Sequence, residues 1–398
     1  MADQPQFQVG VSLHKDTSSA VEEACRQAAL EWNGEPDLAV VFVSPHHAQG
    51  LEEAATQVTK IFSPRVLLGC TGQGIIGAGR ELERQPAVTV WLARLPGMDI
   101  TPFHLEFYPT ESGFGVSGWP DVPSSRNPPL FLVLAEPYSS PMVQLLPLIG
   151  ERYPGVVAIG GMASGAQGPG GHRVMLNEAV FDNGVVGAAL TGDVRVVTVV
   201  SQGCRPIGER FLITRAEGNV IYELSGKSAF ERLHETFAAL SPEEQAMARQ
   251  GLHLGVTINE SQEKFQRGDF LVRNLMGADQ EQGSLALTDI VKGGQTVQFH
   301  LRDSKTASED LYELLESRRN GLEGSVPAGA LLFSCNGRGS HLFGKPDHDA
   351  TAVHKQLGDI PVAGFFANGE IGPVGGENFL HGFTASIAIF CRPAAAQG

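Results

Sequence analysis

Apolar runs that break into glycine-rich loops are the main pattern along this chain of 398 residues. The runs Ala330–Ser334 and Pro361–Phe366 flank a polar segment, Asp349–Gly358, that can form a helix. Runs this apolar, bounded by turn residues and joined through a helix, predict neighbouring parallel strands in a buried sheet. The loops that follow both strands then lie at the same edge of that sheet.

The same layout occurs twice more. In each copy an apolar strand, a loop, a helix and a second apolar strand precede a glycine turn, and a further apolar run follows. The first glycines of the turns align as Gly69, Gly160 and Gly364. Because the copies are too long and too irregularly spaced for a solenoid, we interpret them as duplicated domains. The alternative is that any α/β protein shows this order of elements. The earlier copies are Asp37–Pro45, Gly50–Phe62 and Arg65–Gly77, then Pro128–Ser140, Met142–Arg152 and Val156–Gly168, and the three returning runs are Ala87–Leu95, Val185–Leu190 and Phe383–Phe390.

This pattern predicts an α/β fold of two domains. Each domain has a mixed β-sheet covered by helices and is built from the duplicated strand–helix–strand–Gly-loop units, with the second strand of each copy central. A chain of 398 residues exceeds what one core usually supports, which also favours two domains. We place the boundary near Val220, between domains 1–219 and 220–398. Finding Val40–Ser44 and Leu67–Gly69 in different sheets would contradict this prediction.

Composition narrows the classes of partner. The net charge is −15 and the pI is near 5.2, which disfavours nucleic acid or an anionic membrane as the main partner, because both reward basic surface. No stretch approaches 18 consecutive apolar residues, so we expect no membrane insertion. Five scattered cysteines do not form a disulfide framework, and the N-terminus lacks the features of a signal peptide. We therefore expect a cytoplasmic protein.

Several separated motifs carry a family resemblance. The run GCRPIGERFLITRAEGNVIYELSGKSAFERL, the turn FSCNGRG, and PVAGFFANGEIGP with a late HGFTAS resemble the FIST family, named after F-box and intracellular signal transduction. The early GCTGQGIIG is similar to the glycine-cysteine turn of an N-terminal FIST domain. Its GCTGQG segment departs from the family, which has serine or threonine and alanine between the cysteine and the last glycine. The resemblance runs from about Gln8 to Phe390. It implies a stand-alone sensory protein that binds a small ligand, with amino acids as the ligand class.

Arg338 and Glu370 are the best pair of candidate binding residues. They follow the two strands of the third copy, 32 positions apart, and would face each other across a crevice of the kind in which open α/β sheets bind ligands. Arg338 would hold a carboxylate in its planar fork, and Glu370 would accept an ammonium group. The structural alternative is a salt bridge that ties two loops together. Asn336 and Asn368 would orient the ligand, or only adopt the turn conformations of these loops.

Two cysteines complete the candidate set. Cys335 lies beside Arg338, whose charge would favour a nucleophilic thiolate, although most cysteines at strand ends are small buried hydrophobes. His341, His348, His354 and His381 are all candidates for a Cys–His dyad, and the sequence does not choose among them. Cys70 and Thr71 belong to the first glycine loop, which could approach a ligand.

The sequence contains few signs of a binding site for a metal or another cofactor. His46 and His47 are adjacent rather than four apart, no C-x-x-C or H-E-x-x-H motif occurs, and no glycine turn has the P-loop sequence. We predict no metal, no cofactor and no catalytic residue. The predicted function is a cytoplasmic sensory protein whose ligand is an amino acid or a related small carboxylate, with a protein partner in a signalling pathway left open. The alternatives are a protein-interaction platform through the C-terminal FIST domain and a Cys-dependent enzyme.

Overall fold

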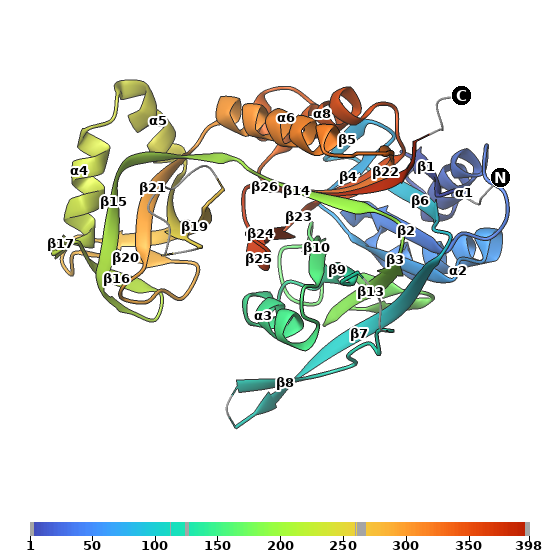
Figure 1. Ribbon diagram of the computed structural model, residues 1–398, viewed down its shortest axis with the longest axis horizontal. Coiled ribbons are helices and arrows are strands. Elements are labelled where there is room, and N and C mark those ends of the chain that lie inside the picture. Colours follow the sequence, from blue (N-terminus) through green and yellow to red (C-terminus); the bar gives the residue numbers. More distant parts are fainter. Residues whose placement is uncertain (1–3, 112, 124–126, 259, 261–267, 395–398) are drawn as a thin grey trace. The chain divides into compact units, whose positions relative to one another are not determined.

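The computed structural model describes residues 4–111, 113–123, 127–258, 260 and 268–394 (Figure 1). The chain divides into two compact units. Unit 1 consists of residues 1–200, 311–380 and 384–398, and unit 2 of residues 201–310 and 381–383. All three predicted copies lie in unit 1. The predicted boundary near Val220 lies among the residues of unit 2 and stays a prediction.

Unit 1 is built from three repeats of one arrangement, which confirms the α/β fold and its duplicated units. In each repeat a first strand pairs in parallel with a second strand, a helix connects the two, and a returning strand pairs antiparallel with the first strand. Val40 pairs with Leu68, so the two runs whose separation would have contradicted the prediction share one sheet. The first repeat comprises β2 (Leu38–Val43), η1 (Pro45–Gly50), α2 (Leu51–Phe62), β3 (Val66–Thr71) and β6 (Val88–Arg94); the second β9 (Leu130–Ala135), α3 (Met142–Arg152), β10 (Val157–Met162) and β13 (Val185–Gly192); the third β22 (Ser325–Cys335), α7 (Gly339–Phe343), α8 (His348–Leu357), β23 (Val362–Ala367) and β26 (Thr384–Pro393).

The aligned glycines have one physical reason in all three repeats. A Cβ added at Gly69, Gly160 or Gly364 would lie 2.5, 1.8 or 1.7 Å from a carbonyl oxygen of the neighbouring first strand. Side chains do not tolerate such distances, so only glycine fits between the paired strands at this position. The oxygens belong to Val41, Val133 and Leu332.

After its second strand, each repeat sends a β-hairpin into the sheet of another repeat. The hairpin of the first repeat pairs with β23 of the third, that of the second with β3 of the first, and that of the third with β10 of the second. The exchange is therefore cyclic, and each sheet needs strands from two repeats. The hairpins are β4 (Gly74–Gly77) with β5 (Arg80–Glu83), β11 (Val174–Leu176) with β12 (Ala179–Phe181), and β24 (Glu370–Val374) with β25 (Glu377–His381).

The three sheets of unit 1 contain six, seven and six strands. Their strand orders are β1-β6-β2-β3-β11-β12, β25-β24-β10-β9-β13-β7-β8 and β14-β26-β22-β23-β4-β5. The second strand of each repeat is interior, as predicted. The remaining elements are β1 (Gln6–Ser12), α1 (Thr17–Ala28), β7 (Met98–Thr110), β8 (Gly113–Ser117), β14 (Val196–Gln202) and α6 (Ser304–Asn320), of which the last two continue into unit 2.

A shared aromatic core joins the inner faces of these sheets. The ring of Phe7 lies 5.3 Å from Trp91 and 5.6 Å from Phe390, and Phe42 of the first repeat lies 4.9 Å from Phe365 of the third. Truncation of one such buried ring to alanine typically costs about 3–5 kcal/mol of stability. Helices cover the outer faces, and α6 and α8 lie side by side over the third sheet (Figure 1).

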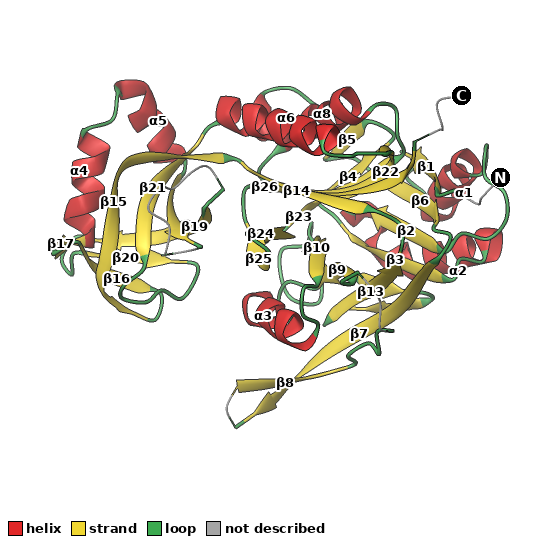
Figure 2. Ribbon diagram, in the orientation of Figure 1, coloured by secondary structure: helices red, strands yellow, loops and turns green. Residues whose placement is uncertain are grey.

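Unit 2 is a separate, all-antiparallel structure. Six of its strands close on themselves in the order β15-β21-β18-β19-β20-β16, because β15 also pairs with β16. The helices α4 and α5 run along the outside of these strands (Figure 2), and Ser228 and Ser241 cap their N-termini through hydroxyl groups. Its elements are β15 (Cys204–Glu217), β16 (Val220–Leu224), β17 (Lys227–Ser228), α4 (Ala229–Ala238), α5 (Pro242–Gln250), β18 (Leu252–Thr257), β19 (Phe270–Asp279), β20 (Ser284–Leu287) and β21 (Thr296–Arg302).

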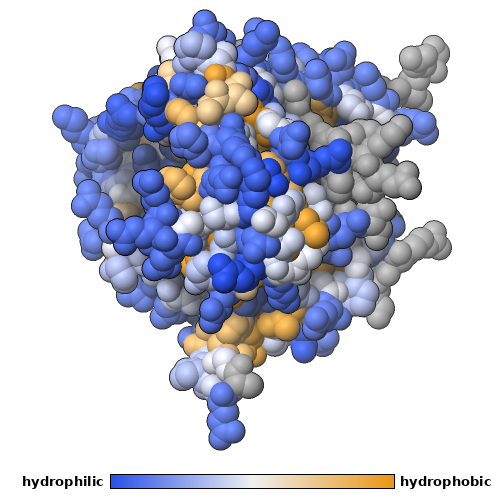
Figure 3. Space-filling view, turned by 90° about the vertical axis from the view of Figure 1, so that its left-hand side faces the viewer, coloured by the Kyte–Doolittle hydropathy of each residue, from blue (hydrophilic) through white to orange (hydrophobic). Residues whose placement is uncertain are grey.

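The face drawn in Figure 3 is mainly hydrophilic, with hydrophobic residues in separate patches rather than one continuous area. Unit 2 exposes a few large hydrophobic side chains, Leu212, Met276 and Ile290. Within the described residues, no helix has the length and apolar character that crossing a membrane requires.

Candidate functional site

The candidate site lies at the carboxyl edge of β22 and β23 in the third repeat. Cys335 pairs with Ala367 at the ends of these parallel strands, so the loops that follow them are adjacent. The backbone N–H of Asn336 donates to the Ala367 carbonyl at 3.0 Å. Arg338 follows the first of these strands and Glu370 the second. The charge of Arg338 acts on the ionisation of Glu370, which reflects their proximity.

Arg338 is fully buried and paired with Asp349 of α8. Its Nε and Nη2 donate to the two carboxylate oxygens of Asp349 at 2.7 and 2.8 Å, and Ser334 Oγ donates to the same carboxylate at 2.8 Å. The guanidinium carbon lies 5.2 Å above the ring of Phe343. Burial opposes the ionisation of Asp349, but the charge and hydrogen bonds of Arg338 outweigh it, and the pKa of Asp349 is lowered. Asp349 therefore occupies the planar fork that we had assigned to a ligand.

A second carboxyl group lies against the start of α8. Glu81 comes from β5, the hairpin strand that the first repeat contributes to this sheet. Its Oε1 accepts hydrogen bonds from the backbone N–H groups of Asp349 at 2.6 Å and Ala350 at 2.9 Å. Burial, together with the negative charge of Asp349, raises the pKa of Glu81 to about 8. The group is consequently protonated at neutral pH, and it satisfies helix N–H groups without adding a charge.

His348 completes this buried cluster. Its ring lies 3.4 Å from the ring of Phe343, nearly parallel to it, and its Nδ1 lies 2.9 Å from Asp349 Oδ1. Of the four histidines that we considered as partners of Cys335, His348 has a buried carboxylate partner, whereas His354 lies 3.8 Å from the exposed Asp359.

Glu370, the acidic member of the predicted pair, is also fully buried. Its Oε2 accepts hydrogen bonds from the Thr384 backbone N–H at 3.1 Å and from the Thr384 hydroxyl at 2.8 Å. Burial raises the pKa of Glu370 to about 8, against the opposing effects of Thr384, Arg338 and a hydrogen bond to Cys335. At neutral pH the side chain is therefore mostly an uncharged acid. The described residues show no ion pair between Arg338 and Glu370, whereas Arg338 pairs with Asp349.

The position of Glu370 is acidic in one repeat only. Glu370 pairs with Gly161, the residue after the aligned glycine of the second repeat. In the same register, Val174 pairs with Cys70 and Ile75 pairs with Phe365. The equivalent hairpin residues are thus valine and isoleucine, which pack as ordinary core. A buried acid at a position that packs well with apolar residues indicates a chemical role rather than a packing role.

Three polar atoms of the predicted site have unused hydrogen-bonding capacity. Among the described residues, Arg338 Nη1 has no acceptor and Asn336 Oδ1 has no donor, although both atoms are buried. Glu370 Oε1 accepts no hydrogen bond from a nitrogen or oxygen donor there. Buried polar atoms are nearly always paired, because an unpaired one costs about 1–3 kcal/mol. The cluster therefore offers a guanidinium N–H, an amide oxygen and a carboxyl group to a ligand that would satisfy them.

The other predicted residues lie in different surroundings. Asn368 is exposed, and its backbone N–H donates to the Met162 carbonyl at 3.0 Å. Cys70 is fully buried in β3, where burial raises the pKa of its thiol well above the ordinary value. Thr71 is also buried, and its Oγ1 accepts a hydrogen bond from the Arg173 backbone N–H at 3.2 Å. The roles of these three residues in binding stay predictions.

Ser164 holds together the ends of the three second strands, a role that we did not foresee. Its Oγ accepts a hydrogen bond from the Gln73 N–H at 2.7 Å and donates to the Phe366 carbonyl, and its N–H donates to the Thr71 carbonyl at 3.0 Å. The three glycine loops are fixed to one another through this one buried side chain.

Sequence reasoning also missed Asp349, Glu81 and Thr384. Asp349 was visible as the start of a helix beside the predicted crevice, so its charge was a usable signal. Glu81 reaches the site through the hairpin exchange, which no local pattern reveals.

All five cysteines are free thiols, and Cys335 is the one that is not buried. The described part of the chain contains no group of three or more His, Cys, Asp or Glu side chains that could hold a metal ion.

Comparison with known proteins finds both FIST domains in this chain. The family model of the FIST N domain matches residues 37–227, and that of the FIST C domain matches residues 229–373. The chain is 42% identical over 383 residues to the uncharacterized protein MT0656 of Mycobacterium tuberculosis, covering 96% of this chain and 98% of the relative. The uncharacterized protein Mb0898c of Mycobacterium bovis is similar to the same extent, with 42% identity over 383 residues and the same coverage of both chains.

Proposed function

Because this chain belongs to the FIST family, whose domains are associated with signal transduction, we propose that it is a cytoplasmic sensory protein that binds a small ligand. The proposed ligand is an amino acid or a related small carboxylate. Its binding site is the carboxyl edge of the third repeat, around Asn336, Arg338 and Glu370.

One observation carries this proposal: the polar atoms without partners belong to three residues that were chosen from the sequence alone. A ligand carboxylate would accept a hydrogen bond from Arg338 Nη1, while Asp349 keeps the rest of the guanidinium fixed. A ligand ammonium group would donate to Asn336 Oδ1 and to Glu370. Because burial raises the pKa of Glu370 to about 8, a nearby ammonium group would replace the proton on this carboxyl group.

Access to this site requires a local movement. Arg338 and Glu370 are fully buried, whereas Asn336 and Gly337 are partly exposed and Asn368 is exposed. A ligand would therefore enter where the loops after β22 and β23 meet. Such an opening is an expected property of a sensor, since binding must change the populations of two conformations.

A thermal-shift screen of the protein against the amino acids and small carboxylates tests the proposal. A ligand at a hundredfold excess over its dissociation constant adds about 2.7 kcal/mol of stability. The variants Glu370→Gln and Asn336→Ala should each weaken the binding of a hit, Glu370→Gln by about thirtyfold or more. Glu151→Gln is the matched control, because Glu151 is exposed on α3 and lies in neither of the loops that form the site. Unchanged affinity in both site variants would show that the ligand does not bind at this edge of the sheet.

The two other candidate functions predict different outcomes. If the chain is a protein-interaction platform through its C-terminal FIST domain, no compound in the panel should raise the melting temperature. If it is a Cys-dependent enzyme, iodoacetamide should alkylate Cys335 rapidly at neutral pH, since Cys335 lies close to the Arg338 guanidinium, which favours a thiolate, and is the only cysteine of the chain that is not buried. Cys70 provides the internal comparison, and equally slow modification of both thiols would argue against the enzyme.

A further inference from the structure

A large groove lies at the opposite end of the third repeat from the candidate site. It follows β1 from Gln4 to Val9 and is bounded by the amino-terminal parts of β22 and β23, at Pro327 and Val362. Its volume is about 910 Å³, which is within the range typical of ligand-binding cavities. All of its walls belong to unit 1.

Apolar residues contribute to the walls of this groove. Lining residues of this kind are Pro5, Phe7, Val9, Pro327, Ala328, Ile360, Pro361 and Val362. Phe7 belongs to the shared aromatic core, so this part of the floor is rigid. A preformed apolar floor removes apolar ligand surface from water without reorganisation of the protein.

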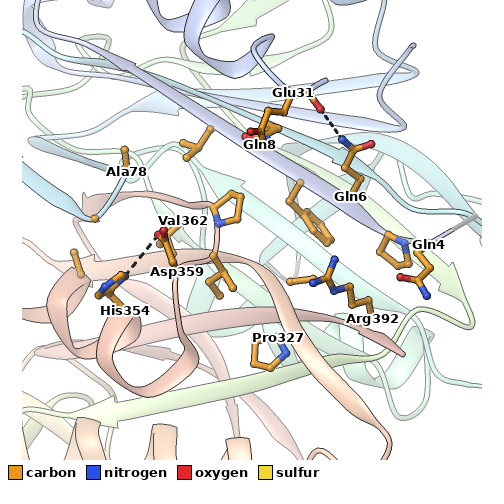
Figure 4. A pocket seen from close by; sticks show the side chains of 18 of the residues that line it. Gln4, Gln6, Gln8, Glu31, Ala78, Pro327, His354, Asp359, Val362 and Arg392 are labelled. Atoms are coloured by element: carbon orange, nitrogen blue, oxygen red, sulfur yellow. Dashed lines mark hydrogen bonds and ion pairs between the residues drawn. The ribbon is translucent and has the colours of Figure 1, made fainter. Parts of the chain in front are cut away.

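The charged groups are separated along the groove. Figure 4 shows Arg392 with Gln4 and Gln6 at one end and His354 with Asp359 at the other. His354 Nδ1 lies 3.8 Å from Asp359 Oδ1, and the Asp359 side chain is 98% exposed, so this end is an open surface. Within the described part of the chain, the guanidinium of Arg392 is left without a hydrogen bond or an ion pair.

The amides beside Arg392 are held in place. Gln6 Nε2 donates to the Glu31 carbonyl at 2.8 Å, and Gln8 Nε2 lies 3.4 Å from the Glu31 carboxylate. The Glu31 carboxylate is therefore associated with an amide, and Arg392 is the arginine that lines the groove. It can donate two parallel hydrogen bonds to a carboxylate.

We propose that this groove binds an organic anion with an apolar body. The anionic group pairs with Arg392, and the body lies along Phe7, Val9 and Val362. The carboxylate of Asp359, at the other end of the groove, disfavours the reversed orientation. This site is separate from the one around Arg338 and Glu370, so its test does not depend on the proposed sensory function.

Titration of the intact protein with the fluorescent acid 11-(dansylamino)undecanoic acid tests this inference. We expect saturable binding with enhanced fluorescence. The methyl ester of the same compound should bind at least tenfold more weakly, because it lacks the charge. Arg392→Gln should weaken binding of the acid at least tenfold and abolish its advantage over the ester.

Two further variants keep the result interpretable. Arg26→Gln removes an exposed arginine that does not line the groove and pairs with Glu22, and it should leave binding unchanged. Ala328→Trp should fill the groove and block both the acid and the ester. Absence of saturable binding, equal affinity for acid and ester, or unchanged affinity in Arg392→Gln would each overturn the inference.

Discussion

The first and third repeats share one backbone arrangement but bury different chemistry at equivalent positions. Gly69 and Gly364 lie in the same register against their first strands, which makes His47 the counterpart of Arg338 and Ile75 the counterpart of Glu370. His47 is buried and hydrogen-bonded to the Thr17 hydroxyl, whereas Arg338 forms a bidentate ion pair. The first repeat is thus mainly scaffold, and the third departs from it where we locate the site.

This difference shows how a function can be added to a repeated fold. The strand pairing and the aligned glycines are the same in both repeats, so they belong to the scaffold. The buried carboxyl groups of Glu81 and Glu370 and the ion pair of Asp349 occur around the third repeat, where burial makes them costly. Groups that cost stability and are not needed for the scaffold are the best candidates for a function. Predictions that compare the two repeats test this reasoning.

The largest effect is expected from Arg338→Met. This change leaves the Asp349 carboxylate buried without its partner, and we expect a loss of about 3–5 kcal/mol in the free energy of unfolding. The counterpart change in the first repeat, His47→Leu, should cost about 1 kcal/mol, because it mainly removes the hydrogen bond to Thr17. Denaturant unfolding measures both values. Adding Asp349→Leu to Arg338→Met should recover much of the loss, and equal losses in the two single variants would refute the comparison.

A smaller effect is expected from pH. The pKa of Glu370 is about 8 in the folded protein, above its ordinary value of 4.5, so the stability that it contributes is complete below pH 4.5 and is lost as the pH rises through 8. Glu81 has the same sign and the same range. Unfolding free energies measured from pH 5 to 9 should therefore fall less steeply in Glu370→Gln than in the original protein. Ile75→Val, at the counterpart position, should leave the slope unchanged. Parallel slopes for Glu370→Gln and the original protein would mean that Glu370 is ionised in the folded state.

The smallest difference between repeats is expected at the aligned glycines. Gly69→Ala and Gly364→Ala should each destabilise the protein by about 1–3 kcal/mol, because the added methyl group meets a carbonyl oxygen of the first strand in both repeats. The two losses should agree within about 1 kcal/mol when measured by denaturant unfolding. A large loss in only one of them would show that the repeats do not share this constraint.

The sequence was sufficient for the parts of the fold that are local. The apolar runs around Val40 and Leu68 predicted parallel partners correctly, because a helix of this length between two buried strands allows few other arrangements. The hairpin exchange could not be predicted, since short strands such as β4 do not specify which distant strand they will pair with. Glu81 was not predicted as a residue of the site for the same reason, because it reaches α8 from the hairpin of another repeat.

The sequence predicted which residues form the candidate site, but it did not predict how their side chains pair. Arg338, Glu370 and Asn336 were chosen from charge, amide chemistry and their place after two strands. The partner of Arg338 was not predicted, because the choice between Glu370 and Asp349 depends on side-chain packing that spacing does not report. The closed six-stranded arrangement of unit 2 was likewise beyond the sequence, since only the pairing of β15 with β16 closes it.

The cyclic exchange of hairpins also sets the order in which unit 1 can be completed during synthesis. The strand β4 leaves the ribosome near residue 77, but its partner β23 follows only after residue 361. Until then its edge has no permanent neighbour, and unpaired edges are prone to pairing with other chains. A fragment limited to residues 37–227 would keep β4 and β10 without β23 and β24. The two FIST domains that the family models match therefore cannot complete their β-sheets one after the other during synthesis.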